Sequence, residues 1–359
     1  MCNVVKEYGS EFDWDSTLPY ISDTYLEHPL KSTTAYLFRS GRDALKAVAQ
    51  GYSVTHKKIM LPALCCESMV SPFTMNGYDI IYYRLNADCT VNEEDVISKI
   101  SNDCIFLYMS YFGVKPMTDI FLSSLRKKYQ DVKFVEDRTH NALHRVGENT
   151  FKADSTVISI RKWLSVPDGG LLFTTGSFDN DYLLDTKFSN IRKVAMQKKS
   201  EFLKTGDEEI KSQFRKLLNE ASKLLDVLAC PYKMTDESME LLNKIDFDRM
   251  LNDRQRNAKI LEKELMPLIE KGKIKFISKD SESSTIYFPI VVNNRDWLQG
   301  KLAEKSVFCP VIWPLPVGAE AVCENSKFIA ENMLAIPCDQ RYSAEDMLVI
   351  AKTISDVLK

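Results

Sequence analysis

Short apolar runs alternate with amphipathic stretches between about residues 35 and 175. The apolar runs lie at 58–61, 79–83, 104–109, 132–135, 156–160 and 171–174, and helical patterns lie at 41–50, 93–100 and 119–129. Buried strands that alternate with helices predict an α/β fold with a mainly parallel, doubly wound sheet. Because ligands bind such sheets at the carboxyl ends of the strands, polar residues that follow these runs are candidates for a site.

Beyond residue 176 the pattern changes to long amphipathic helices. Residues 207–229 place apolar residues on one face, a second helix is expected after Thr235 as N-cap, and a longer one spans 246–269. The C-terminal part mixes a strand at 284–292 with helices at 296–305 and 344–358. We therefore expect an N-terminal segment, a large domain and a smaller α+β domain that the long helix joins to it, at residues 1–33, 34–235 and 236–359.

Composition narrows the class of protein. The chain has 359 residues, a net charge of -3 and no long basic run, which argues against nucleic acid as the main partner. No apolar stretch is long enough to cross a bilayer, and the N-terminus lacks the pattern of a signal peptide. The nine cysteines match no zinc spacing and indicate reduced thiols of a cytoplasmic protein. With only four histidines, we expect no histidine-rich metal site.

Three polar residues near strand ends form a pattern that suits pyridoxal phosphate. Lys162 follows one apolar run, Ser159 lies just before it, and Asp137 follows another run. A lysine can form the Schiff base, a carboxylate keeps the ring nitrogen protonated, and a hydroxyl meets the phosphate. Taken singly, Lys162 is read more simply as a surface lysine and Asp137 as a helix N-cap. Their combination favours the cofactor site.

Two further features fit such a site but also have ordinary explanations. His140 follows Asp137 by one turn and is placed to reach the ring hydroxyl or cover the ring, unless it simply packs against a helix. Gly41, Arg42 and Asp43 open a helix after a strand, where backbone N–H groups favour phosphate. Asp43 would repel a phosphate unless its side chain turns away, and Arg42 could offset that charge. The alternative is ordinary helix capping by Ser40.

The order of these motifs resembles fold type I pyridoxal-phosphate enzymes and, within them, the DegT-type sugar aminotransferases. The similarity extends over about residues 34–355. The matching segments are the helix start at 40–45, the Leu-Pro segment at 61–66, Ser-Tyr-Phe-Gly at 110–113, Glu-Asp-x-x-His at 136–140, Lys162 with the glycine pair at 169–170, and Leu-Ala-Ile-Pro at 334–337.

The resemblance implies roles for these residues. Lys162 is the Schiff-base lysine and proton shuttle, Asp137 pairs with the pyridine nitrogen, and His140 lies near the ring hydroxyl. Ser159 and the helix start at residues 41–43 bind the phosphate. Members of the family are usually homodimers with their active sites at the subunit interface, and we expect the same arrangement here.

Three departures mark a divergent branch of that family, and one of them is that Arg42 and Asp43 replace the Thr and Ala of the family's helix start. Ser159 precedes Lys162 by only three residues, closer than the family's phosphate-binding serine. Cys66 stands where the family has the aromatic residue that stacks on the cofactor ring. Stacking is therefore expected either from another residue, such as Tyr111 or Phe112, or to be weaker than in the family.

The resemblance implies an aminotransferase of polysaccharide biosynthesis. An amino acid, glutamate in much of the family, would donate its amine, and a keto sugar carried on a nucleotide would accept it. Trp313 is a candidate to contact the sugar or base, with turn packing as the alternative. Two other functions remain open: a lyase or decarboxylase of amino acids, for which Arg341 could bind a carboxylate unless it is a surface residue, and a catalytically silent binding protein.

Overall fold

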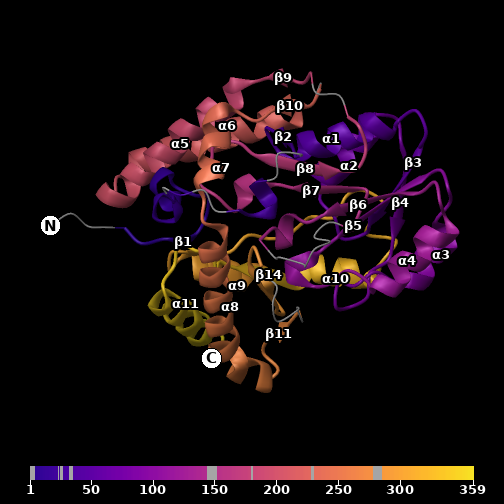
Figure 1. Ribbon diagram of the computed structural model, residues 1–359. Helices are drawn as coiled ribbons and strands as arrows, with labels where there is room; N and C mark the ends of the chain where they lie inside the picture. The colour runs from indigo at the N-terminus through magenta and orange to yellow at the C-terminus, as the bar shows by residue number, and fades with distance from the viewer. Residues whose placement is uncertain are drawn as a thin grey trace.

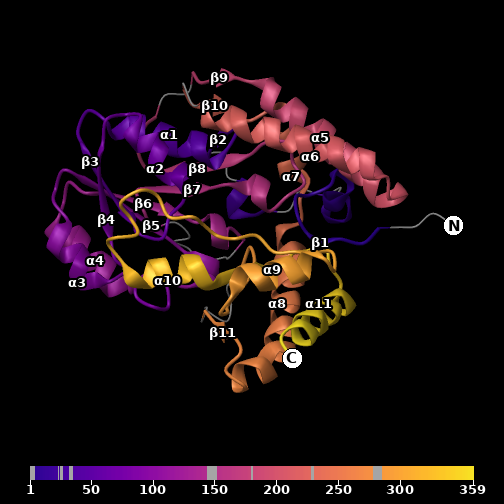
Figure 2. The ribbon, with the colours of Figure 1, turned by 180° about the vertical axis from the view of Figure 1, so that it is seen from behind.

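The computed structural model describes residues 5–22, 24, 27–31, 35–143, 152–178, 181–227, 230–277 and 285–359. A large sheet with helices on both sides makes up one part of the molecule, and a smaller group of helices and strands from the C-terminal part lies beside it (Figures 1 and 2). Among the described residues, no helix has both the length and the apolar character needed to span a membrane.

The large sheet has nine strands and is mainly parallel. Their order is β4 (Asp79–Tyr83), β3 (Lys58–Pro62), β5 (Cys104–Met109), β6 (Lys133–Asp137), β7 (Ser155–Ile158), β8 (Gly170–Thr174), β2 (Tyr36–Phe38), β10 (Tyr232–Lys233) and β9 (Leu183–Leu184). The first five strands are parallel, and β8 is antiparallel to both β7 and β2. The predicted fold class is therefore confirmed, and the predicted strands match the observed ones to within two residues at each end.

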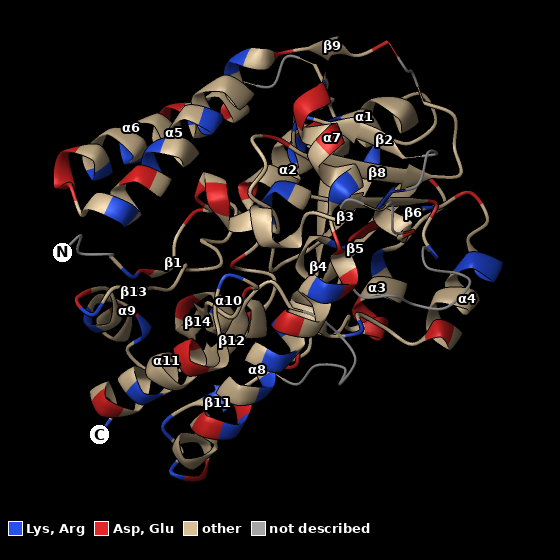
Figure 3. Ribbon diagram, turned by 60° about the vertical axis from the view of Figure 1, so that its left-hand side comes forward, with Lys and Arg blue, Asp and Glu red and all other residues tan. Residues whose placement is uncertain are grey.

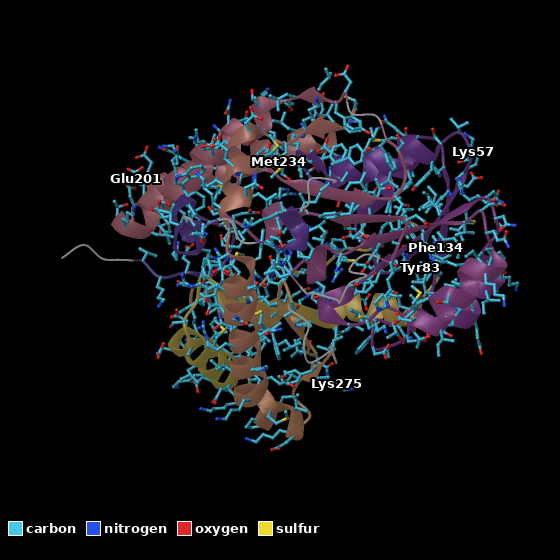
Figure 4. The ribbon with its side chains drawn as sticks, in the orientation of Figure 1. Lys57, Tyr83, Phe134, Glu201, Met234 and Lys275 are labelled. Carbon is cyan, nitrogen blue, oxygen red and sulfur yellow. The ribbon has the colours of Figure 1, made fainter. Side chains whose placement is uncertain are left out.

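Helices cover both faces of this sheet, which explains why its central strands are apolar throughout. Every residue of β5 is buried. The covering helices include α1 (Gly41–Tyr52), α2 (Glu67–Thr74), α3 (Glu93–Lys99) and α4 (Asp119–Lys128). Figure 4 labels Tyr83 and Phe134 within the sheet region, and Lys57 at the edge of the molecule.

A hairpin of two long helices, α5 (Thr186–Thr205) and α6 (Glu208–Asp226), extends from the sheet. The chain turns between them at Gly206, whose φ of 72° lies in the left-handed region that favours glycine. Helix α6 corresponds to the predicted helix at 207–229, of which residues 228–229 lie outside the described part. Figure 3 shows basic and acidic residues mixed along both helices.

The C-terminal part is built on a three-stranded antiparallel sheet of β11 (Lys275–Phe276), β12 (Phe288–Val291) and β14 (Met333–Ile336). Around it lie α7 (Asp236–Lys244), α8 (Phe247–Glu270), α9 (Arg295–Ala303), α10 (Glu324–Asn332) and α11 (Ala344–Val357). The predicted strand start at Ser284 lies outside the described residues. Near the N-terminus, β1 (Tyr8–Gly9) pairs with β13 (Val307–Phe308).

The long helix α8 connects two hydrophobic cores. Its first turns place Phe247 and Met250 in the core of the large sheet, and later turns place Leu261 and Leu265 in the core of the smaller one. Helix α10 also reaches back to the first core through Ile329. The carboxyl ends of β6 and β7 lie between these two parts of the structure, where the candidate site residues are found.

Candidate active site

The loop that carries Lys162 follows β7 and is held by backbone hydrogen bonds. The Lys162 N–H donates to the Ser159 carbonyl at 3.2 Å, and the Arg161 N–H donates to the Gly169 carbonyl at 3.3 Å. The glycine pair is required for packing, because a Cβ on Gly170 would lie 2.2 Å from the backbone carbon and oxygen of Ser40. Burial lowers the pKa of the Lys162 amine, while Cys66 and Asp137 oppose that shift.

Asp137 ends β6 and faces the same small cavity as Lys162. Its Oδ1 accepts a hydrogen bond from the Thr139 N–H at 2.8 Å. Burial raises the pKa of this carboxyl, and the hydrogen bonds from Thr139 together with the charge of Lys162 lower it. The pKa of Asp137 is raised on balance, and Thr139 and Lys162 limit that rise and so support the charged form that a pyridinium partner needs.

We call this small cavity the inner cavity; it has a volume of about 50 Å³. Its walls come from the start of α1, the start of α2, the ends of β5, β6 and β7, and one residue of the C-terminal part. The lining residues are Gly41, Arg42, Leu45, Cys66, Ser68, Met69, Met109, Asp137, Thr139, Val157, Ser159, Arg161, Lys162 and Trp313. The structure thus brings Lys162, Asp137, Ser159, Gly41, Arg42 and Cys66 together, as the sequence predicts.

The start of α1 lies directly against Ser159. A Cβ on Gly41 would be 2.9 Å from the Ser159 Cβ, so only glycine allows this approach. Asp43 does not line the inner cavity: its carboxylate accepts from Arg39 Nε at 3.2 Å and Arg39 Nη2 at 3.0 Å. Its N–H donates to Ser40 Oγ at 3.1 Å, so neither group of Asp43 is directed to the cavity.

The Arg42 side chain lines the inner cavity, but its guanidinium is anchored to α6. Its Nη1 donates to the Leu225 carbonyl at 2.6 Å and to the Asp226 carboxylate at 2.7 Å. Arg42 therefore cannot offset the charge of Asp43, as sequence reasoning suggested, and Arg39 does so instead. The start of α1 therefore contributes Gly41 and backbone groups to the cavity, while the carboxylate of Asp43 is paired with Arg39.

His140 is 2% exposed and packs between two aromatic rings. Its ring centroid lies 4.6 Å from that of Phe112 and 5.3 Å from that of Trp313, with an angle of 31° between the His140 and Trp313 planes. Burial lowers the pKa of His140 well below its ordinary value, and the charge of Lys162 acts in the same direction. The ring is therefore neutral, and its Nδ1 has no hydrogen-bond partner among the described residues.

The aromatic residues expected to stack over the cavity are placed differently from the prediction. Tyr111 is 1% exposed and donates its hydroxyl to the Leu64 carbonyl, and neither Tyr111 nor Phe112 lines the inner cavity. Trp313, which sequence reasoning linked to the substrate, lines the cavity together with Cys66.

A larger cleft, here called the outer cleft, continues outward from Lys162 with a volume of about 830 Å³. It shares Arg161, Lys162 and Trp313 with the inner cavity. One wall is a face of α6 and the opposite wall is formed by α9 and residues 308–313. Sequence reasoning missed several charged residues that line the cleft: Glu7, Glu11, Arg161, Arg192, Lys211, Arg215 and Asp296. No sequence motif identifies these residues as part of a site. The one available signal is that Arg161 directly precedes Lys162 in the sequence.

Arg341 lies outside this cleft. Its guanidinium forms a two-pronged pair with Asp339, with Nε and Nη2 each donating to a carboxylate oxygen at 2.8 Å. It also donates to the backbone carbonyls of Ser10 and Glu11 and stacks on Phe12, with its guanidinium carbon 4.3 Å from the ring centroid. Arg341 therefore anchors the N-terminal segment, and its donors are not directed at a substrate.

The fold and site define a class: α/β proteins of fold type I, with a lysine at the end of a strand facing a carboxylate. Residues 139–355 match the DegT/DnrJ/EryC1/StrS aminotransferase family. This match covers more than half of the chain, which therefore belongs to that family. No curated protein matches the sequence.

Solved structures share the fold at low sequence identity. The chain is similar to the putative sugar aminotransferase Spr1654 from Streptococcus pneumoniae in its PMP form, with 17% identity, a TM-score of 0.65 and coverage of 99% of this chain and 97% of that one. It is also similar to DesV from S. venezuelae (15%, TM-score 0.63, coverage 98% and 90%). PseC from Helicobacter pylori, an aminotransferase of pseudoaminic acid biosynthesis, matches at 12% with a TM-score of 0.62 and coverage of 98% and 99%.

Proposed function

We propose that this protein is a pyridoxal-phosphate-dependent aminotransferase that moves an amino group from an amino acid, glutamate in the first instance, to a keto sugar linked to a nucleotide. The observation that carries the proposal is the convergence of Lys162, Asp137 and Ser159 on one cavity. Family membership supports the reaction class. The fold neighbour Spr1654, which occurs in PLP and PMP forms, supports the choice of cofactor.

The residues of the inner cavity fit this cofactor. Asp137 would hold the ring nitrogen, Lys162 would bind the reactive carbon, and Ser159 with the α1 start would hold the phosphate. His140 lines the adjoining outer cleft, and its Nδ1, which has no partner in the described part of the chain, is available to the ring substituents. Because the inner cavity and the outer cleft share Arg161, Lys162 and Trp313, a bound cofactor is in direct reach of a substrate in the cleft.

The protein's own residues carry out the proton transfers. When bound, pyridoxal phosphate supplies an electron sink for the bond that breaks at the substrate carbon. Lys162, whose pKa is lowered by burial, can take up and return a proton there as general base and acid. Burial raises the pKa of Asp137, and the hydrogen bonds that Thr139 donates to it limit that rise. His140 stays neutral and adds no competing charge.

Trp313 supplies the aromatic wall that Cys66 lacks. Both residues line the inner cavity, and the Trp313 ring packs close to that of His140. A large flat ring at this position shields one side of the cavity from water. Its position on the C-terminal part, beside the outer cleft, lets the same side chain contact a substrate.

Further parts of the proposal rest on the family resemblance. The protein acts in the cytoplasm, in polysaccharide biosynthesis, as a homodimer whose active sites lie at the subunit interface. Its domains divide at about residues 33 and 235, with α8 linking the larger to the smaller.

An absorption experiment tests this function. Purified protein is loaded with pyridoxal phosphate and then given L-glutamate, with Lys162→Ala as the matched variant. We expect a visible band that is absent in Lys162→Ala, and its bleaching by glutamate together with an equimolar amount of 2-oxoglutarate. Release of carbon dioxide or ammonia without 2-oxoglutarate would point to a lyase or decarboxylase. Absence of any band in the wild type would contradict the cofactor assignment.

A further inference from the structure

Arg161 lies at the junction of the two cavities, and within the described part of the chain its guanidinium is unpaired. No hydrogen bond or ion pair joins its guanidinium to any described residue, and its buried Nε has no acceptor. Burial and the neighbouring Arg192 lower its pKa to about 10, so the side chain remains charged at neutral pH. Arg161 is half-buried, and its buried Nε–H without an acceptor is costly, while its remaining donors are open to the cavities that it lines. This arrangement indicates an anion that is bound during function.

The groups around Arg161 form one end of the inner cavity and suit a phosphate. Gly41 and Arg42 bring the N-terminus of the 12-residue helix α1 to that end, where the helix dipole favours an anion. Ser159 lines the same end, is only 5% exposed, and its hydroxyl makes no hydrogen bond to a described residue. The Ser159 hydroxyl and the Arg161 guanidinium, neither of which has a partner among the described residues, thus line the cavity beside one helix N-terminus.

Other charged groups near this end are already engaged. The Arg42 guanidinium is held by α6, and the Asp43 carboxylate is held by Arg39. The Glu11 carboxylate, which faces Arg161 from the N-terminal segment, accepts from Arg192 at 3.3 Å. Of the two arginines that line the inner cavity, Arg161 is therefore the one whose guanidinium has no acceptor among the described residues. Arg42 has an unpaired Nε, but its Nη1 is bound to α6 through Leu225 and Asp226, and the Lys162 amine is assigned to the reactive carbon.

We propose that Arg161 binds the phosphate group of the cofactor, together with Ser159 and the N-terminus of α1. This inference rests on the proposed function, because it assigns a ligand to the same site. It also accounts for the short spacing between Ser159 and Lys162: the intervening arginine supplies a charge-assisted contact.

The test compares pyridoxal phosphate with pyridoxal, which lacks the phosphate. Dissociation constants for both are measured by titration of the visible band in the wild type, Arg161→Gln and Arg161→Lys. Arg126→Gln is the matched control, because Arg126 pairs with Asp154 near the opposite ends of β6 and β7. Circular dichroism and thermal unfolding verify that each variant is folded.

We expect the preference for pyridoxal phosphate over pyridoxal to fall about tenfold or more in Arg161→Gln, with nearly unchanged pyridoxal affinity. In Arg161→Lys this preference should fall by a smaller factor, since lysine keeps the positive charge but lacks the planar set of donors. In Arg126→Gln the preference should equal that of the wild type. If Arg161→Gln keeps the wild-type preference while its KM for glutamate rises, Arg161 binds the substrate carboxylate and the inference is overturned. If the wild type binds neither compound, the proposed function itself fails.

Discussion

Thr139 offers the sharpest test of how the site is held together, because one small residue supports three others. Its N–H donates to Asp137 Oδ1 at 2.8 Å, and its Oγ1 accepts the Ser159 N–H at 3.0 Å. Its carbonyl accepts the indole N–H of Trp163 at 2.7 Å. Thr139→Val keeps the shape and both backbone bonds and removes only the hydroxyl.

The expected loss follows from the groups left behind. In Thr139→Val the Ser159 N–H loses its acceptor in a buried position, which costs about 1–3 kcal/mol. Thr139→Ser is the matched control: it keeps the hydroxyl and loses one methyl group, worth about 0.8 kcal/mol. We therefore expect the free energy of unfolding to be lower in Thr139→Val than in Thr139→Ser.

The same substitution changes the charge state of Asp137. The Thr139 side chain lowers the pKa of this carboxyl against the effect of burial, so its removal raises that pKa. An aspartate is ionised above its pKa. When the solution is acidified, Asp137 should therefore lose its charge at a higher pH in Thr139→Val than in the wild type. Tight binding of pyridoxal phosphate should be lost at the same higher pH.

Two measurements check these effects. Urea unfolding followed by circular dichroism compares the two variants, and titration of the visible band between pH 5 and 8, roughly the range in which proteins are most stable, compares their cofactor affinity. The reasoning is refuted if both variants unfold at the same urea concentration and lose cofactor at the same pH.

Three further predictions concern other parts of the site. Gly170→Ala should abolish folding or lower the melting temperature sharply, because its Cβ would lie 2.2 Å from backbone atoms at the start of α1; Gly300→Ala, with no atom within 4 Å, should be tolerated in the same thermal scan. Arg39→Ala should lower the free energy of unfolding by about 3–5 kcal/mol in a urea titration, because it strands the buried Asp43 carboxylate, and removing Asp43 as well should restore part of the loss. The capture of pyridoxal by the apoprotein should rise with pH at a midpoint below that of an ordinary lysine, about 10.4, because burial lowers the pKa of Lys162; a stopped-flow pH series with an ordinary midpoint would contradict this.

Much of the large sheet was predictable because its strands are buried on both faces and appear as continuous apolar runs. Helix α5 was not predicted from the sequence. Its buried face includes the polar residues Ser189, Arg192, Lys199 and Ser200, which interrupt the apolar pattern by which a helix is recognised. The helix α2 also escaped notice: it is short and includes Pro72.

Some residues of the site could be predicted from the sequence and others could not. Lys162, Asp137 and Ser159 lie at strand ends, so their approach follows from parallel pairing of β6 and β7. Trp313 and Arg161 take their places through contacts between distant parts of the chain, which no local spacing reveals. The sequence likewise does not reveal that Arg341 pairs with Asp339, because each residue taken alone is also typical of an exposed loop.

The central claim is that Lys162 holds the cofactor, and peptide mapping tests it most directly. Protein incubated with pyridoxal phosphate is reduced with borohydride, digested, and analysed by mass spectrometry. The account predicts a phosphopyridoxyl group on the peptide that contains Lys162, and none on that peptide in Lys162→Ala. A label on a different lysine of the wild type, or no label at all, would contradict it.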